Sequence, residues 1–332
     1  MHSRGIKDAS GPGGSKSSRP PKPSPREGLG SGTSIRRQGF YVVVDDKAIL
    51  APDGLIDTLL ATFRAPEYAP PTLPATAAEL LELSRHADVE FAQVVSLLER
   101  DSVVATQVLR KAQSAFYAGR QPVRSLHEAI VRLGLSTLRD MFMEVVFKNN
   151  VFCAPGYDEP MRHLQRHSTA VAHIARKVCE RTGHAPHAQH AFLCGLLHDI
   201  GKAMCMIVLA EQATGVSVSD DNHEAHTPPA FDKVYPAVQR AHEPAGAILG
   251  HLWRLPDPIV RVISSHHTIP HGKDNAIVAA VNIADWIAND LGLLVQPPVD
   301  SLSRDAMHAL GASEATVNDI KLHVREMVAR IE

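Results

Sequence analysis

The chain has 332 residues, of which 44% are hydrophobic, and its formal net charge at pH 7 is −2. This length suffices for one large domain or two smaller ones, and the nearly neutral charge gives no global argument for binding nucleic acid or an anionic membrane. The four cysteines show no Cys-x-x-Cys spacing, which argues against a disulfide framework and fits a reducing compartment. Because we find neither a signal peptide nor an apolar run of about 18 residues, we expect a cytoplasmic protein without a transmembrane segment.

The first 65 residues differ in composition from the rest of the chain. Residues 1–38 are rich in glycine, serine and proline, and they carry eight lysines and arginines against two acidic residues. Such a segment cannot bury enough apolar surface to fold, so we predict a disordered basic tail with at most a weak role in binding nucleic acid. Residues 39–65 are a short N-terminal segment, in which the β-prone stretch 39–50 could form a hairpin around Asp45 and Asp46.

A proline-rich linker, Pro66–Pro74, precedes several short amphipathic segments that we expect to form an N-terminal helical lobe at 66–150. Ser125 and Glu128 have the spacing of a capping box at the start of one of these helices, and Gly134 is placed to end it. Helices of this length joined by short loops favour a compact helical lobe.

A second helical lobe is predicted at 151–291, and it includes a helix from Met161 to Cys179. Residues 292–332 are expected to form a C-terminal helical extension after a break. The predicted fold class is therefore all-α, with the first lobe packed on a helical bundle. The sequence shows no glycine-rich phosphate loop and no serine or cysteine nucleophile motif.

Histidine is the most distinctive feature of the composition, with 19 residues, most of which lie between His163 and His271. Within this window, the segment Gly195–Lys202 joins an apolar run directly to His198 and Asp199. A charged pair in such a place must be hydrogen-bonded, ion-paired or metal-bound to be tolerated. The alternative is a histidine–aspartate pair that faces water at the end of a helix.

Other helices are placed to bring further histidines and one aspartate to this pair. His163 and His167 lie four residues apart and so share one face of a helix, whereas His173 is expected to be peripheral. The remaining candidates are His242, expected to open a helix, His266 and His267 at the end of a helix, and Asp285 inside an otherwise apolar helix. A lone buried aspartate is costly, and a metal ion or a histidine across the bundle would explain it.

Imidazoles and carboxylates that converge from several helices could hold one or two first-row divalent metal ions. Mixed nitrogen and oxygen ligation suits Fe, Mn, Zn, Co or Ni and does not select among them. A metal-activated hydroxide could then attack a phosphorus centre, with Asp199 at the metal and Lys202 neutralising a phosphate oxygen. A polar network of the same side chains without metal is the alternative.

Two groups of motifs resemble those of a known family. The first group is Leu109–Tyr117 (Leu-Arg-Lys-Ala-Gln-Ser-Ala-Phe-Tyr) and Glu128–Gly134 (Glu-Ala-Ile-Val-Arg-Leu-Gly). The second group is His167-Ser168, Gly195–Lys202, Trp253–Pro256 and His266-His267. In this combination, over roughly residues 66–291, the chain resembles the HDOD (HD-related output domain) proteins of bacterial signalling, with Gln113 where asparagine is usual.

The resemblance implies a helical lobe packed on an HD-type bundle, related to the HD and HD-GYP metal phosphohydrolases. It implies metal ligands at His167, His198, Asp199, His242, His266, His267 and Asp285, and a lysine of the active enzymes at Lys202. His163 lies where some HD-GYP enzymes have a further carboxylate ligand. The chain departs from those enzymes because no Gly-Tyr-Pro follows His267 and because a polar insertion, Ser217–Thr227, lengthens the gap before His242.

Two functional hypotheses follow. The first is a signalling output protein that binds metal in its HD-like lobe and recognises a protein partner or a nucleotide; the HDOD-like first lobe and the missing Gly-Tyr-Pro favour it. The second is a metal-dependent phosphohydrolase or phosphodiesterase acting on a nucleotide or cyclic dinucleotide, which the full ligand set favours. The stretch Ser114–Tyr117 is expected to be a packing junction rather than a ligand site.

Overall fold

The computed structural model describes residues 52–73, 75–83, 91–100, 102–114, 116–117, 123–215, 227–269, 275–293 and 302–330. All of these residues belong to one unit of the chain, residues 39–332. Every regular element within the described ranges is a helix, which confirms the predicted all-α fold class. The predicted basic tail at 1–38 and the possible hairpin at 39–50 lie outside the described residues.

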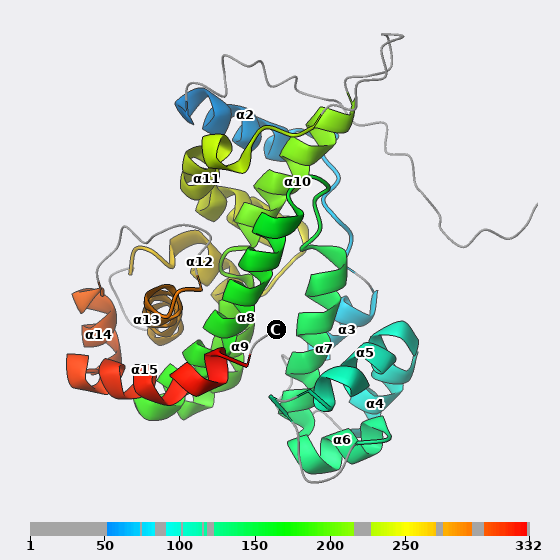
Figure 1. Ribbon diagram of the computed structural model, residues 1–332, viewed down its shortest axis with the longest axis vertical. Helices are drawn as coiled ribbons and strands as arrows, with labels where there is room; N and C mark the ends of the chain where they lie inside the picture. Colours follow the sequence, from blue (N-terminus) through cyan, green and yellow to red (C-terminus); the bar gives the residue numbers. More distant parts are fainter. Residues whose placement is uncertain are drawn as a thin grey trace, which may run out of the picture. The chain divides into compact units, whose positions relative to one another are not determined.

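The helices are labelled in Figure 1. The N-terminal helices are α2 (Pro52–Arg64), α3 (Ala75–Leu83), α4 (Phe91–Glu99), α5 (Ser102–Ala112), α6 (Leu126–Leu133) and α7 (Leu135–Asn150). They are followed by α8 (Asp158–Arg181), the short 3-10 helix η1 (Ala185–His187), α9 (Ala188–Leu197), α10 (Ile200–Gly215), α11 (Phe231–Leu252), α12 (Asp257–Ser265) and α13 (Ala276–Asp290). The last described helices are α14 (Arg304–Leu310) and α15 (Glu314–Val328).

Helix α7 holds the N-terminal helices together. Helices α3, α4, α5 and α6 pack on it, and α9 contacts it from the following part of the chain. With neighbours on several sides, α7 buries a nearly continuous run of side chains, including Leu138, Met141 and Phe142. This packing connects the N-terminal helices to the helices that carry the candidate site.

The predicted capping box at the start of α6 is confirmed in one half and altered in the other. The hydroxyl of Ser125 accepts a hydrogen bond from the backbone N–H of Glu128 at 3.0 Å, as predicted. The carboxylate of Glu128 accepts from the N–H of Arg124 at 2.8 Å, instead of from the N–H of Ser125. Gly134 follows the last residue of α6 with a φ of 85°, a conformation that favours glycine.

We expect Ser125→Ala to lower the free energy of unfolding by about 1 kcal/mol, because the N–H of Glu128 loses its acceptor. Ser125→Asp is the matched control, since its carboxylate keeps an oxygen that can accept from the N–H of Glu128. Urea denaturation followed by circular dichroism measures both variants. Equal losses in the two would argue against a capping role for the hydroxyl.

Helix α8 is the centre of the following bundle, where α9 and α13 pack along it and α15 covers it further. His167, Val171, Ile174 and Val178 follow one another at helical spacing and are all buried. This stripe faces the core, where α9 and α13 pack against α8. The candidate ligand His167 is therefore part of the buried face of α8.

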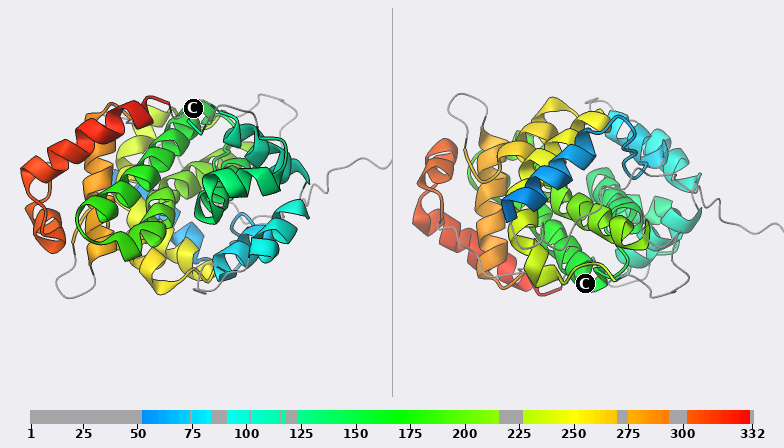
Figure 2. Two further views of the ribbon diagram at one scale, coloured as in Figure 1. Left: turned by 90° about the horizontal axis from the view of Figure 1, so that it is seen from below. Right: turned by 90° about the horizontal axis from the view of Figure 1, so that it is seen from above.

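The pattern of the sequence did not lead us to predict α2. Leu55, Leu59 and Phe63 recur every four residues, and each is at most 4% exposed. Helix α2 lies along α11, as the right-hand view of Figure 2 shows, and Arg240 of α11 forms an ion pair with Asp53. Residues 52–64 thus pack their apolar side chains against α11 and extend the hydrophobic core.

One predicted helix boundary is corrected, and the C-terminal extension is divided into two helices. His242 does not open a helix, because α11 begins at Phe231 and continues through two internal prolines, Pro236 and Pro244. A proline resembles a helix start in sequence, since it is favoured in the first turn, but the surrounding packing carries this helix past both. The C-terminal extension contains two helices, because Gly311 ends α14 with a left-handed φ of 60°.

One helical stretch, Ala185–Ala213, passes a length and composition test for crossing a membrane. Its most apolar window is 89% buried inside the structure, as expected for a core helix. Its hydropathy is therefore explained by packing and is weak evidence for a membrane span.

Candidate metal centre

Helices α8 to α13 bring most of the predicted site residues together. The residues are His167 in α8, His198 and Asp199 between α9 and α10, Lys202 in α10, His242 in α11, His266 and His267 at the end of α12, and Asp285 in α13. Six of them are buried, with exposed fractions from 0% for His198 and His266 to 9% for Asp285. Lys202 and His267 are partly buried. The polar groups therefore converge inside the bundle.

The His198–Asp199 pair occupies the turn between two helices. Helix α9 ends at Leu197 and α10 begins at Ile200, so the two residues project from the junction. A β-carbon at Gly195 would lie 2.8 Å from the α-carbon of Ala172 in α8. Glycine at this position therefore allows α9 to approach α8 closely, which brings His198 toward His167.

A second close approach joins α10 to α11. A β-carbon at Gly201 would lie 1.9 Å from the carbonyl oxygen of His242 and 2.8 Å from the backbone nitrogen of Gly246. Neither distance is compatible with a side chain in the present arrangement. The two helices therefore cross nearly backbone to backbone, and this crossing places Asp199 against His242.

The first group of ligand candidates surrounds one oxygen of Asp199. Nε2 of His167 lies 3.3 Å from Nε2 of His198 and 3.1 Å from Oδ1 of Asp285. Oδ2 of Asp199 lies 3.3 Å from Nε2 of His198 and 3.7 Å from Nε2 of His167. Two imidazoles and two carboxylates thus meet within the reach of a single cation.

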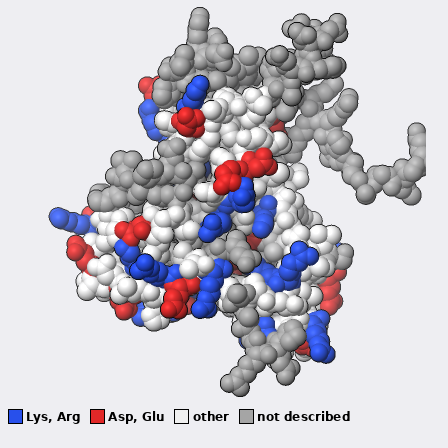
Figure 3. Space-filling view, in the orientation of Figure 1, with Lys and Arg blue, Asp and Glu red and all other residues white. Residues whose placement is uncertain are grey.

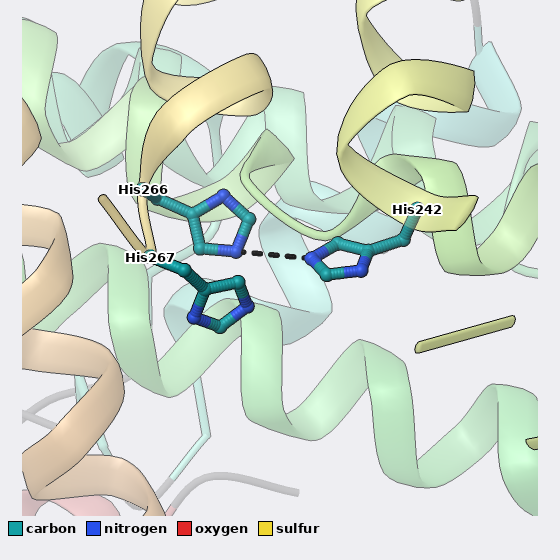
Figure 4. Close-up of side chains that lie close together, drawn as sticks. All are labelled: His242, His266 and His267. Carbon is teal, nitrogen blue, oxygen red and sulfur yellow. Dashed lines mark hydrogen bonds between the residues drawn. The ribbon is translucent and has the colours of Figure 1, made fainter. Parts of the chain in front are cut away.

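The second group consists of His242, His266 and His267, whose rings lie side by side (Figure 4). Nε2 of His242 lies 3.3 Å from Nε2 of His266, and the ring centroids of His266 and His267 are 4.2 Å apart. The other oxygen of Asp199, Oδ1, lies 3.5 Å from Nε2 of His242 and 3.6 Å from Nε2 of His266. Asp199 therefore presents one oxygen to each group.

The tautomer that each of these histidines takes in its neutral form can be derived from its backbone contact. Nδ1 donates to a carbonyl oxygen in four cases: His167 to Leu293, His198 to Gly195, His242 to Gln239 and His266 to Val262. A neutral imidazole that donates through Nδ1 has an unprotonated Nε2, which can only accept. In that neutral form, the Nε2–Nε2 contacts would bring lone pairs together, a geometry that a shared cation would relieve. Histidine ligands of metals are oriented in this way by a carbonyl behind the ring.

Asp199 is an ionised carboxylate with one oxygen unsatisfied. Its Oδ2 accepts from Nζ of Lys202 at 2.7 Å, while its buried Oδ1 has no hydrogen-bond partner among the described residues. Burial works to raise the pKa of Asp199, but His198 and Lys202 beside it hold that pKa well below its ordinary value. A buried anionic oxygen without a donor is costly, so this arrangement fits a bound cation.

Two histidines of the second group, His242 and His267, are held neutral. Burial, together with the charge of Lys202, lowers the pKa of His242 well below its ordinary value. Burial and the neighbouring His266 lower the pKa of His267 to about 4. Neutral imidazole is the form that coordinates metal, so these side chains are in the required state at neutral pH.

The structure does not bring His163 to the other candidates. Its side chain is 45% exposed, and its Nε2 lies 2.7 Å from Oε1 of Glu159. The expectation rested on the shared helix face with His167, but one turn of helix moves a residue by about 5.4 Å along the axis. At that level of α8 the face is open to solvent, so His163 pairs with Glu159 instead of joining the cluster.

Three residues around the cluster were missed by the sequence analysis. Oε1 of Glu243 accepts from the backbone N–H of His267 at 3.2 Å, and Asn282 donates to the carbonyl of His266 at 2.7 Å. Asn289 donates to Oδ1 of Asp285 at 3.0 Å, one turn along α13. Each lies within four residues of a candidate ligand on the same helix, or next to one, and that proximity was the available signal.

The HDOD domain family matches residues 71–269, which is more than half of the chain. The chain belongs to this family. The HDOD match spans α3 to α12, so it includes the first helical lobe and all candidate ligands except Asp285.

Solved structures show the same fold. An HDOD domain protein of unknown function from Geobacter sulfurreducens is 24% identical, with a TM-score of 0.65, and the alignment covers 83% of this chain and 98% of that one. A candidate metal-dependent phosphohydrolase from Shewanella amazonensis SB2B is 18% identical, with a TM-score of 0.61 and coverages of 85% and 99%. A candidate signal transduction protein from Marinobacter aquaeolei VT8 is 18% identical, with a TM-score of 0.59 and coverages of 85% and 65%.

An uncharacterised protein of Treponema pallidum (strain Nichols) is 24% identical over 205 residues, which are 61% of this chain and 39% of that protein. This HDOD chain thus matches well under half of the length of that relative. At these identities the comparisons with solved structures concern the fold alone.

Proposed function

We propose that this HDOD chain is a bacterial signal-transduction output protein that holds a divalent metal in its HD-like lobe. The observation that carries the proposal is the convergence of the imidazole Nε2 atoms of His242 and His266 on the unsatisfied, buried Oδ1 of Asp199. The family and the fold of the Marinobacter signal transduction candidate support the signalling role. We assign the HDOD domain to 66–291, with lobes at 66–150 and 151–291, between the N-terminal segments (1–38 and 39–65) and the extension at 292–332.

The residues present fit one or two metal ions. His167, His198 and Asp285 would hold one ion together with Oδ2 of Asp199, and the second group of histidines would hold another with Oδ1. Mixed nitrogen and oxygen ligands suit Fe, Mn, Zn, Co or Ni. When bound, such an ion supplies positive charge that can polarise a phosphoryl oxygen or fix its ligands in place.

The enclosure of the centre favours an output role over turnover. The six buried candidates are at most 9% exposed, which leaves little surface for a phosphoester beside them. A metal in such a place would fix the positions of α8 to α13 relative to one another. The outer surface of these helices would then be recognised by a protein partner of a signalling pathway or by a nucleotide. The four free cysteines are consistent with our assignment of the protein to the cytoplasm.

A second candidate function is a metal-dependent phosphohydrolase or phosphodiesterase that acts on a nucleotide or cyclic dinucleotide. The observation in its favour is Lys202, whose Nζ lies 2.7 Å from Oδ2 of Asp199 and whose side chain is 13% exposed. A cation at this place could neutralise a phosphate oxygen while Asp199 binds the metal. The fold likeness to the Shewanella phosphohydrolase candidate supports the same function.

Metal analysis of the purified full chain tests the proposal. The protein is stripped with a chelator, reloaded separately with Mn²⁺, Fe²⁺ or Zn²⁺, passed through a desalting column and analysed by mass spectrometry for metal per chain. We expect metal to be retained by the wild type and lost from Asp199→Ala. A wild type that retains none of these metals would contradict the proposal.

The same samples distinguish the two candidate functions. They are assayed for hydrolysis of bis(p-nitrophenyl) phosphate and of a cyclic dinucleotide. Retained metal without turnover is the result expected for an output protein. Metal-dependent turnover that disappears in Asp199→Ala would favour the phosphohydrolase.

A further inference from the structure

A cavity of about 360 Å³ lies among α5, α7 and α8, and none of the candidate metal ligands lines it. Small-molecule sites have volumes of roughly 300–1,000 Å³ and often lie where two parts of a fold meet. The walls of the cavity come from Gln107 to Tyr117, from α7 and from α8, and Arg330 after α15 completes them. The stretch Ser114–Tyr117, expected to be a packing junction, thus contributes directly to a cavity.

The lining carries positive charge. Its cations are Arg110, Lys111, Lys148 and Arg330. The one carboxylate among the described lining residues, Glu144, is already paired: its Oε1 lies 3.1 Å from Nε2 of His173, and its Oε2 forms an ion pair with Lys111. Lysine and arginine side chains gather near the middle of the face drawn in Figure 3, where α7 and α8 stand opposite each other in Figure 1.

Two lining cations, Arg110 and Lys148, are left without a compensating carboxylate in the described parts of the chain, whereas Lys111 pairs with Glu144 and Arg330 pairs with Glu326. Burial works to raise the pKa of Glu144, but the hydrogen bond from His173 and the charge of Lys111 lower that pKa, so the carboxylate is ionised. Arg110 and Lys148 form no ion pair with any carboxylate among the described residues. An anion entering the cavity would therefore meet cationic side chains that are not neutralised within the described structure.

One wall of the cavity is aromatic. The ring centroids of Phe116 and Tyr117 are 4.5 Å apart, and that of His173 lies 4.9 Å from Phe116. Two buried hydroxyls on this wall, those of Tyr117 and Thr169, have no hydrogen-bond partner among the described residues. Thr169 is only 3% exposed, so its unsatisfied hydroxyl calls for a ligand or an ordered water.

We infer that this cavity binds a nucleoside monophosphate, with the phosphate against Arg110, Lys148 and Arg330 and the base against Phe116 and Tyr117. Cations alone would suit any small anion. The aromatic wall adds a surface for stacking a heterocycle, and the two unsatisfied hydroxyls can exchange hydrogen bonds with its polar edge. This site is separate from the metal centre, and the inference goes beyond the proposed function.

Isothermal titration calorimetry of the full chain tests the inference. The probes are AMP, GMP, CMP and UMP, with adenosine and inorganic phosphate as the two partial ligands. EDTA is present throughout, so that a phosphate cannot bind through a metal ion. We expect at least one monophosphate to bind, and both partial ligands to bind at least about tenfold more weakly than it does, because each lacks one half of the contacts.

Three variants locate the site. Arg110→Glu and Lys148→Glu replace exposed cations of the lining, so we expect both variants to fold. We expect each to lower the affinity for the monophosphate by about tenfold or more. Tyr117→Phe removes one unsatisfied hydroxyl. We expect it to lower the affinity for the nucleotide, while the thermal stability of the free protein stays unchanged or rises. Lys233→Glu, an exposed lysine of α11 outside the lining, is the matched control and should bind as the wild type does.

Three results would overturn the inference. The first is no binding of any of the four monophosphates at millimolar concentration. The second is inorganic phosphate binding as tightly as the best monophosphate, which would mean an anion site without recognition of a nucleoside. The third is nucleotide binding that Arg110→Glu and Lys148→Glu leave unchanged, which would place the nucleotide elsewhere on the protein.

Discussion

Replacing Asp199 by asparagine is expected to weaken metal binding by about 100-fold or more. Each oxygen of Asp199 faces one group of imidazoles, so a single substitution removes negative charge from both groups. Loss of a residue that only orients a ligand costs roughly 10–100-fold in metal affinity, and loss of a carboxylate ligand costs at least as much. Competition with a fluorescent metal indicator measures the affinity of the wild type and of Asp199→Asn for Mn²⁺ and Zn²⁺.

The same substitution is expected to destabilise the metal-free protein. Nζ of Lys202 lies 2.7 Å from Oδ2 of Asp199, and both side chains are largely buried. Removing one partner of a buried ion pair leaves the other charge uncompensated, which typically costs about 3–5 kcal/mol. A lower metal affinity could therefore reflect a damaged fold, and the measurement needs a variant that separates the two effects.

Asp199→Asn combined with Lys202→Met is that variant. Methionine removes the unpaired charge but fills a similar volume, so we expect the double variant to recover most of the stability of the metal-free wild type. Its metal affinity should remain as low as that of Asp199→Asn. His163→Ala serves as a second control, because His163 is exposed and pairs with Glu159, and it should leave metal affinity unchanged. Metal binding of wild-type strength in the double variant would show that Asp199 is not a ligand.

The central residues of the candidate site could be predicted from the sequence because they are charged or polar residues within apolar segments. His198 and Asp199 follow an apolar run, and Asp285 interrupts an apolar helix, so each indicates a polar group that must find a partner inside the fold. Helical spacing also placed His167 on a shared face with His163, and the structure buries His167 there. These are local patterns, and the structure agrees with each of them.

The features that could not be predicted depend on how deeply each turn of a helix is buried and on contacts between helices. His163 and His167 share a face of α8, yet only His167 reaches the core, because spacing does not tell where along its length a helix becomes buried. His173 was expected to be peripheral for the same reason. It is only 8% exposed and bonds to Glu144, which lies in α7 and has no sequence pattern that links it to α8.

Alanine in place of Gly201 is expected to lower the stability of the protein strongly, although it removes no candidate ligand. The added β-carbon would lie 1.9 Å from the carbonyl oxygen of His242, and backbone atoms cannot turn aside as a flexible side chain can. Overpacking typically costs about 1–3 kcal/mol, and we expect about 3 kcal/mol or more here because α10 must move away from α11. For a domain of this size that corresponds to a fall in Tm of roughly 6–12 °C.

Gly54→Ala is the matched control for the gain of one methyl group on a helix. No atom lies within 4 Å of a β-carbon at Gly54 in α2, so alanine there should leave stability unchanged or raise it by up to about 1 kcal/mol. Differential scanning calorimetry of both variants compares the two positions. Equal Tm values would mean that α10 and α11 can separate without loss, contrary to the crossing described for Gly201 and Gly246.

Gly201→Ala also tests how the fold positions the metal centre. Asp199 and Lys202 belong to the same turn as Gly201, so a shift of α10 carries both away from His242, which α11 holds in place. The variant should therefore lose metal affinity at temperatures where it is still folded, although every candidate ligand is present. Asp199→Asn with Lys202→Met should lose metal affinity while keeping its Tm. Retained metal affinity in folded Gly201→Ala would show that the histidines bind the metal without the α10–α11 crossing.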